Sequence, residues 1–281
     1  MIKRILLIGL ISFSLFNCDT KKHQYPEQFQ SQFLCYVGAI CPTQRGVKYG
    51  ILGDSWTDLG LSLPLIESLR VQLEKNYQYK MVGSTLAGQT MKTVYQTGLH
   101  LQVIEEAGPD IKYMLVSLGG NDVQGSPSRY VGRFAEEKQL RFETVKNTLL
   151  DIIRTGNIYK VQKYGGAPLI WIINGYDYPN PDIPSNPGAT GCRPTLRDAG
   201  FTEAEVNSFV VDSLVDYNNL LRDLTTHEPQ LKYINLLGTL GGPSFSQAGH
   251  MWDCIHPNTG GFNLLAKRYV SALEGYTNYE K

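Results

Sequence analysis

Short apolar segments that alternate with amphipathic segments constrain the fold of this chain more than any other feature. Strand-like apolar runs cover residues 47–53, 77–83, 111–118, 169–174 and 233–237. Helical patterns cover residues 61–76, 91–107, 142–156, 199–227 and 261–274. Strands that alternate with helices form a parallel sheet with helices on both faces. The sequence therefore predicts one α/β domain, a three-layer α/β/α sandwich around a five-stranded parallel sheet.

Three of the predicted strands end in glycine-rich or polar loops. Gly53, Asp54 and Ser55 follow the first strand, residues 83–90 follow the second, and residues 119–122 follow the third. Loops at the carboxyl ends of parallel strands lie at one edge of the sheet, where such folds build their sites. We therefore expect these loops to meet at a functional site.

The first of these loops carries a candidate nucleophile. The hydroxyl of Ser55 becomes reactive only when a base accepts its proton, and His256 is the candidate base. Asp253 lies three residues before His256 and can hold the imidazole in one tautomer. The N–H groups of Ser55 and Gly88 and the amide of Asn121 can form an oxyanion hole, in which each donor contributes ~3 kcal/mol. These residues predict a serine esterase.

The same segments resemble the sequence blocks of the SGNH/GDSL hydrolase family. Four blocks carry the resemblance: residues 53–55, residues 87–90 around Gly88, residues 119–122 and residues 253–258. Their order and spacing fit over residues 47–274. The resemblance implies a flavodoxin-like fold and an acyl-enzyme on Ser55, with no metal and no other cofactor.

Several of these assignments have alternatives. The second block is the loosest match, and Gly83 can be argued in place of Gly88. Trp56 stands where the family usually has leucine, so its indole lies either at the edge of the pocket or in the core. His250 is the one competitor for the role of base, but no acidic residue lies three positions before it. The remaining histidines are expected in the tether, on the surface or in packing contacts: His23, His100 and His227.

Two segments are longer than a simple α/β unit needs, residues 124–140 and residues 175–197. The second contains Tyr176 and several prolines. We expect both segments to shape the acyl or alcohol pocket, unless they are surface insertions. Asp54 and Asp122 are expected to brace their loops through hydrogen bonds.

The beginning of the chain has the pattern of an exported bacterial protein. Residues 1–17 combine a positive start with an apolar run too short to span a bilayer, as secretory signals do. Residues 15–18 resemble a lipobox, which predicts cleavage before Cys18 and a lipid anchor on it. An ordinary signal peptide of a secreted protein is the alternative. Residues 18–46 are predicted to form a polar tether, and residues 47–281 the hydrolase domain.

Export permits disulfides, and the chain has five cysteines. If Cys18 carries lipid, the remaining four allow three pairings. Cys35 and Cys41 are the natural local pair, which leaves Cys192 with Cys254. This second bridge would hold the loop of the candidate base against the proline-rich segment. A buried free thiol at Cys254 is the alternative.

Composition limits the partners. The formal net charge is +0 and no basic stripe interleaved with aromatic residues is present, so nucleic acid is not expected. We expect a monomer that acts on small-molecule, lipid or acylated-carbohydrate esters. No continuous apolar lid is visible, which favours small or carbohydrate esters over long-chain lipids. An acyltransferase with the same acyl-enzyme and a non-catalytic binding lipoprotein are the alternatives.

Overall fold

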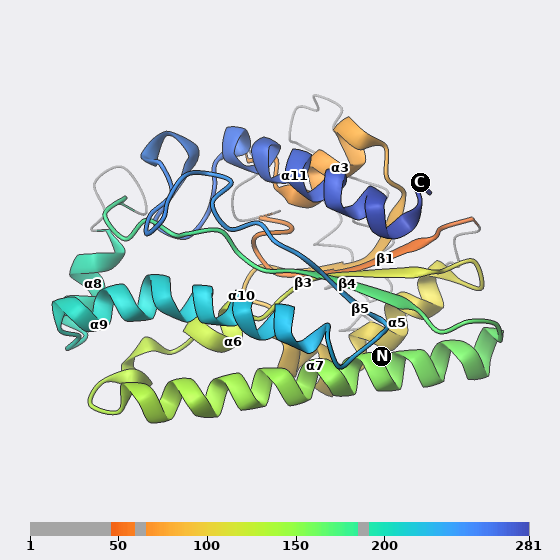
Figure 1. The fold of residues 1–281 in the computed structure, drawn as a ribbon, viewed down its shortest axis with the longest axis horizontal. Helices are drawn as coiled ribbons and strands as arrows, with labels where there is room; N and C mark the ends of the chain where they lie inside the picture. Colours follow the sequence, from red (N-terminus) through yellow and green to blue (C-terminus); the bar gives the residue numbers. More distant parts are fainter. Residues whose placement is uncertain (1–45, 60–65, 185–190, 281) are drawn as a thin grey trace, which may run out of the picture. The chain divides into compact units, whose positions relative to one another are not determined.

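The computed structural model describes residues 46–59, 66–184 and 191–280. These residues form a five-stranded parallel sheet (Figure 1). Its strands are β1 (Tyr49–Gly53), β2 (Met81–Thr85), β3 (Tyr113–Ser117), β4 (Ile170–Asn174) and β5 (Leu231–Ile234). Their order across the sheet is β2-β1-β3-β4-β5, which is the order of flavodoxin-like folds. The predicted fold class is confirmed.

Helices cover both faces of the sheet (Figure 1). On one face, α3 (Leu69–Tyr77) packs against α11 (Thr259–Thr277). The other face is covered by α5 (Leu99–Ala107), α7 (Phe134–Tyr164) and α10 (Ser213–Leu224). The shorter elements are α4 (Met91–Thr97), α6 (Gly120–Gln124), η1 (Pro127–Tyr130), α8 (Cys192–Asp198), α9 (Glu203–Asn207), the π-helical η2 (Ser208–Asp212) and η3 (Ala248–His250). The predicted three-layer sandwich is confirmed as well.

The three central strands β1, β3 and β4 are almost entirely apolar because both faces of the sheet are covered there, whereas the edge strands β2 and β5 also contain polar residues. Every residue of β1 and of β3 is buried. Leu52, Met114 and Trp171 are fully buried at the centre of the core. This core holds the strand ends in place, so the loops that follow them start from fixed positions.

Gly83 belongs to the sheet and not to a loop. It pairs with Ile51 in the parallel ladder between β1 and β2. A Cβ at this position would lie 2.0 Å from the Ile51 carbonyl oxygen, and φ is +143°, a conformation that suits glycine. Gly83 therefore lets two strands approach closely.

Some predicted boundaries are wrong. The predicted helix 91–107 is two helices, with Gly98 as the C-cap of α4. The predicted loop 124–140 is largely helical, because η1 and the first residues of α7 occupy it. The predicted strand 77–83 starts only at Met81, since α3 continues to Tyr77. Within the predicted helical range 199–227, Thr202 and Glu205 form a capping box at the start of α9.

The predicted signal segment, Cys18, the tether and the Cys35–Cys41 pair lie outside the described residues. The described residues all belong to one compact unit, Thr43–Lys281. Among the helices within that described part, none has both the length and the apolar character to cross a membrane.

Candidate active site

Ser55 lies in a turn that directly follows β1. The Asp54 N–H donates to the carbonyl oxygen of Ser117, the last residue of β3, at 3.0 Å. On the other side of β1, the Leu86 N–H donates to the Gly53 carbonyl oxygen at 3.1 Å. These bonds hold the turn against the ends of both neighbouring strands. The half-buried Ser55 side chain is thereby fixed at the carboxyl edge of the sheet.

The structure brings Ser55, His256 and Asp253 into one hydrogen-bonded chain. The distance between Ser55 Oγ and His256 Nε2 is 2.8 Å, and the distance between His256 Nδ1 and Asp253 Oδ2 is also 2.8 Å. An ionised Asp253 can only accept, so His256 Nδ1 carries the proton and Nε2 is free to accept from the serine hydroxyl. This is the geometry of a nucleophile beside an oriented base.

The loop before α11 holds both His256 and Asp253 in place. Asp253 Oδ1 accepts the N–H groups of His256 at 2.6 Å and of Ile255 at 2.8 Å. Burial by itself raises the pKa of Asp253, but the hydrogen bonds from the His256 ring and from these N–H groups outweigh it and hold the pKa below its usual range. Asn258 then caps α11 by accepting the Gly261 N–H at 2.9 Å. Asp253 is therefore an ionised, fixed acceptor.

The other described histidines lie elsewhere. His250 sits in η3 and makes no ring hydrogen bond to Ser55, the contact that His256 makes. His100 is buried on α5 with its Nε2 atom 2.9 Å from Thr155 Oγ1. His227 is exposed in the turn after α10. His23 lies outside the described residues. The geometry at Ser55 thus belongs to His256 alone among the histidines in the described part.

The three predicted oxyanion donors come from neighbouring loops. Asn121 lies in the first turn of α6, and its Nδ2 atom donates one hydrogen to the Gln89 carbonyl oxygen at 3.1 Å. This bond joins the loop after β3 to the loop after β2 and leaves the second amide hydrogen of Asn121 available. Within the described residues, the N–H groups of Ser55 and Gly88 have no acceptor. N–H donors that have no acceptor in the described part of the chain are available to a developing negative charge.

Gly88, and not Gly83, lies in the loop that contacts Asn121. Its φ is +79°, and a Cβ there would meet nothing within 4 Å, so the backbone faces open space. Asp122 braces the same loop, because its carboxylate accepts the N–H groups of Met91 at 2.8 Å and Lys92 at 3.4 Å. Burial raises the pKa of Asp122, while these two bonds oppose the rise. The bracing role expected for Asp122 matches these contacts.

Trp56 belongs to the Ser55 turn, and its side chain and that of Tyr176 are both buried. Trp56 is buried and packs edge-on against Tyr176 and Phe262, with ring centroids 5.1 and 6.2 Å apart. Of the two alternatives for the Trp56 indole, the edge of the pocket or the core, the structure shows the core. Tyr176 was expected in a pocket-shaping segment but is only 2% exposed. Its position two residues after the end of β4 is the signal that could have placed it near the site.

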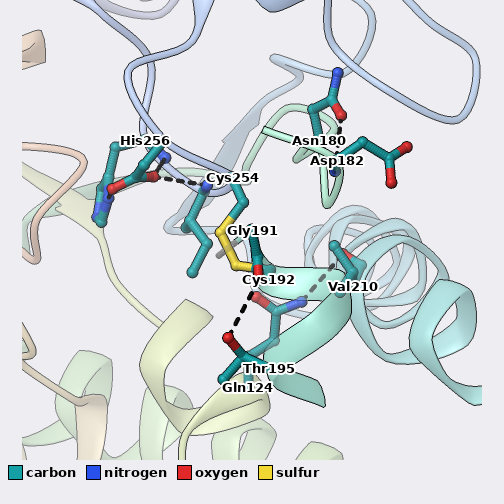
Figure 2. Close-up of a disulfide and its surroundings, with 11 residues drawn as sticks. Gln124, Asn180, Asp182, Gly191, Cys192, Thr195, Val210, Cys254 and His256 are labelled. Atoms are coloured by element: carbon teal, nitrogen blue, oxygen red, sulfur yellow. Dashed lines mark hydrogen bonds and ion pairs between the residues drawn. A yellow bond between two sulfur atoms is a disulfide. The ribbon is translucent and has the colours of Figure 1, made fainter. Parts of the chain in front are cut away.

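The predicted Cys192–Cys254 disulfide is present (Figure 2). It joins the first residue of α8 to the residue that follows Asp253, with the two Cα atoms 6.0 Å apart. Beside it, the Asn180 N–H donates to the Cys254 carbonyl oxygen at 2.9 Å. The loop of the candidate base is therefore held by one covalent bond and one backbone hydrogen bond.

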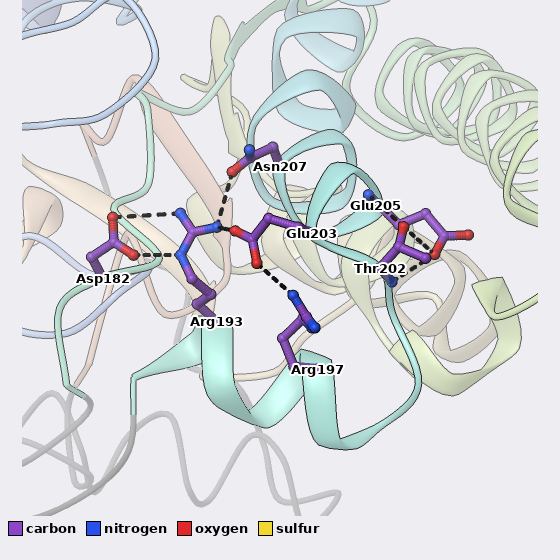
Figure 3. Close-up of polar contacts among 7 residues, drawn as sticks. All are labelled: Asp182, Arg193, Arg197, Thr202, Glu203, Glu205 and Asn207. Carbon is purple, nitrogen blue, oxygen red and sulfur yellow. Dashed lines mark hydrogen bonds and ion pairs between the residues drawn. The ribbon is translucent and has the colours of Figure 1, made fainter.

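The other end of this bridge is fixed by a charged cluster, shown in Figure 3. Arg193 contacts both carboxylate oxygens of Asp182, with Nε at 2.5 Å from Oδ1, and also binds Glu203. Glu203 accepts a further hydrogen bond from Arg197 at 2.8 Å. These contacts tie α8 to α9 and to the segment before the bridge. Sequence reasoning missed this cluster because its members are spread over three segments.

In the described part of the chain, His, Cys, Asp and Glu side chains form no group of three or more that could hold a metal ion.

No protein-family model and no curated protein matches this sequence. Among solved structures, the chain is similar to the lipase Lip_vut3 from a goat rumen metagenome, with 16% identity and a TM-score of 0.53 over 80% of this chain and 97% of that one. It is also similar to Est24, a carbohydrate acetylesterase from Sinorhizobium meliloti, with 11% identity and a TM-score of 0.51 over 82% and 99% of the two chains. A protein from Desulfitobacterium hafniense DCB-2, described as lipolytic and of the G-D-S-L family, has 14% identity and a TM-score of 0.50 over 80% and 99%. At these identities the likeness establishes the shared α/β fold.

Proposed function

We propose that this protein is a serine ester hydrolase of the SGNH/GDSL type, which forms an acyl-enzyme on Ser55. The observation that carries the proposal is the chain from Ser55 Oγ through His256 to Asp253, with both contacts at 2.8 Å. The N–H groups of Ser55 and Gly88, which have no acceptor among the described residues, and the Asn121 amide support the same chemistry. The solved structures with this fold include a lipase and a carbohydrate acetylesterase, which agrees with an ester substrate.

In the proposed reaction, Ser55 Oγ attacks the ester carbonyl carbon while its proton passes to His256 Nε2. The bond to the alcohol then breaks, and the same proton goes to the leaving alkoxide. Water follows on the same base, cleaves the acyl-enzyme, releases the acid and restores the Ser55 hydroxyl. Asp253 stays ionised, because it accepts three hydrogen bonds, and it stabilises the charged imidazole. The oxyanion is held by the Ser55 and Gly88 N–H groups and the Asn121 amide.

We also propose that the protein is exported and anchored through lipid on Cys18, with a tether between the anchor and the hydrolase domain. The pattern of residues 1–18 supports this, and so does the Cys192–Cys254 bridge, since disulfides persist in oxidising compartments. Metabolic labelling with an alkyne fatty acid checks the anchor. Label should enter the wild type and not Cys18→Ser, and an unlabelled wild type contradicts the anchor without affecting the proposed chemistry.

A fluorophosphonate probe and a chromogenic ester panel graded by acyl length test the hydrolase. The probe should label the wild type and not Ser55→Ala. His256→Ala should lose ester turnover by at least ~10³, whereas the matched variant His250→Ala should retain it. A wild type that neither labels nor hydrolyses any ester would point to a binding protein. If products form only when an alcohol acceptor is added, the protein is an acyltransferase.

A further inference from the structure

The hydroxyl of Tyr176 touches two of the loops that form the candidate site. It donates to the Asp54 carboxylate, and it accepts the Gly120 N–H at 3.0 Å. Asp54 directly precedes Ser55, and Gly120 directly precedes Asn121. A single buried oxygen atom therefore joins the neighbour of the nucleophile to the neighbour of the side-chain oxyanion donor.

The direction of these hydrogen bonds is fixed by their chemistry. The Gly120 N–H can only donate, so the one hydrogen of the Tyr176 hydroxyl must go to Asp54. The other carboxylate oxygen of Asp54 accepts the Trp56 N–H at 3.0 Å. Both oxygens of Asp54 therefore act as acceptors, which is the arrangement of an ionised carboxylate. Protonating Asp54 would break one of the two bonds.

The packing around Tyr176 leaves little freedom for its ring. Its centroid lies 5.1 Å from that of Trp56 and 6.0 Å from that of Tyr217. Tyr217 is fully buried and donates to the Leu118 carbonyl oxygen at 2.6 Å, which adds a second contact to the loop after β3. A Cβ at Gly120 would lie 2.9 Å from the Tyr176 ring, so this loop needs a glycine to sit against it. Because the ring is held in place, its hydroxyl can keep the distance between Asp54 and Gly120 constant.

We propose that Tyr176 is a positioning residue for ester hydrolysis, one that sets the spacing between the Ser55 nucleophile and the Asn121 amide through its bonds to Asp54 and Gly120. The inference rests on the proposed function. Tyr176 touches no reacting atom, and it acts through the two loops.

The ionisation of Asp54 gives this role a signature that a merely structural tyrosine lacks. Burial raises the pKa of Asp54 to about 6, while the hydrogen bonds from Tyr176 and Trp56 and the nearby His256 oppose the rise and Asp122 adds to it. The buried Tyr217 hydroxyl also lies within electrostatic range of Asp54. Removing the Tyr176 hydroxyl takes away the strongest of the opposing contacts. The pKa of Asp54 should then rise, and the protonated, mispositioned form should persist to higher pH.

Tyr176→Phe tests the proposal, because it keeps the ring and removes only the hydroxyl. The matched control is Tyr130→Phe, since Tyr130 is also fully buried but donates to the Val123 carbonyl oxygen. We expect Tyr176→Phe to lower kcat roughly 10- to 100-fold, the loss of one hydrogen bond to a charged group, with KM within about twofold. The acid limb of kcat/KM should move to higher pH in Tyr176→Phe and stay in place in Tyr130→Phe.

A Tyr176→Phe protein with wild-type kcat and a wild-type acid limb overturns the inference. If Tyr176→Phe does not fold, Asp54→Asn decides, because an amide cannot accept on both sides and does not titrate. It should lower kcat to a similar extent and change the acid limb, and unchanged values of both overturn the inference. Failure of the proposed function is distinguishable, because then the wild type itself shows neither ester turnover nor fluorophosphonate labelling of Ser55.

Discussion

The Cys192–Cys254 bridge gives the most quantitative test of how the site is held. The double variant Cys192→Ala/Cys254→Ala removes it and leaves the other cysteines in place. The bridge closes a sequence separation of 62 residues, for which loss of the cross-link should cost about 4 kcal/mol of unfolding free energy on the chain-entropy account. This loss should appear in urea unfolding followed by circular dichroism.

Turnover should fall as well, because Cys254 lies in the chain between Asp253 and the two residues, Ile255 and His256, whose N–H groups donate to the Asp253 carboxylate. Small displacements of a base from its nucleophile cost on the order of 10-fold or more in rate. We therefore expect kcat for a short ester to drop by at least about 10-fold, even at temperatures where the double variant is fully folded. Adding a reducing agent to the wild type should reproduce both effects.

The control is Cys35→Ala/Cys41→Ala, which keeps the bridge at the site. Reducing agent should still lower the unfolding free energy of this variant. It should leave the unfolding free energy and kcat of Cys192→Ala/Cys254→Ala unchanged, because the predicted Cys35–Cys41 pair belongs to the tether. An unfolding free energy within about 1 kcal/mol of the wild type, well short of the cross-link contribution, together with unchanged kcat, refutes the reasoning. Free thiols at both positions in the native wild type would refute it more directly.

Two further predictions concern the sheet and the buried acid. Gly83→Ala should cost several kcal/mol in urea unfolding, on the order of other strained close-packed substitutions, because its Cβ would lie 2.0 Å from the Ile51 carbonyl oxygen. Gly88→Ala should cost less, because it adds only the strain of a positive φ and no clash; equal losses would contradict this reading. Asp54 should favour the folded state below its unfolded pKa of 3.8 and lose that contribution as pH rises through its folded pKa of about 6. Asp54→Asn should therefore gain about 2 kcal/mol on the wild type between pH 4 and pH 7, and a pH-independent difference in unfolding free energy would show that Asp54 is not perturbed.

The fold could be predicted from the sequence because the central strands β1, β3 and β4 are nearly continuous apolar runs. A sheet covered on both faces requires exactly such runs, and their carboxyl ends mark where the site must be built. The same logic placed Ser55, Gly88 and Asn121 after strand ends, whereas His256 was identified from its spacing to Asp253 and from the family resemblance. The structure brings Ser55 and His256 into hydrogen-bond contact and joins the Asn121 side chain to the loop that contains Gly88. Helix boundaries were harder, since the break at Gly98 follows from local backbone conformation and not from the hydrophobic pattern.

The supporting contacts could not be predicted in the same way. Tyr176 and Trp56 sit in segments whose composition suggests a pocket wall, and only the packing reveals that both are buried. Arg193, Asp182 and Glu203 belong to three segments, and no local spacing relates them. Pairings of this kind depend on the tertiary structure, which a single sequence does not encode in any short pattern.

Asp54 shows why such a site differs from an ordinary core. A buried carboxylate with a pKa of about 6 is mostly ionised at neutral pH and lowers the stability of the fold there. A neutral hydrogen-bonding side chain could join the same loops at a smaller cost. In the proposed reaction, however, the His256 imidazole takes the Ser55 proton, and the Asp54 carboxylate then attracts the charge that forms on it. On the proposed mechanism, the carboxylate that lowers the stability of the resting protein makes an interaction that strengthens as the transition state forms, and this is the condition under which an interaction accelerates a reaction.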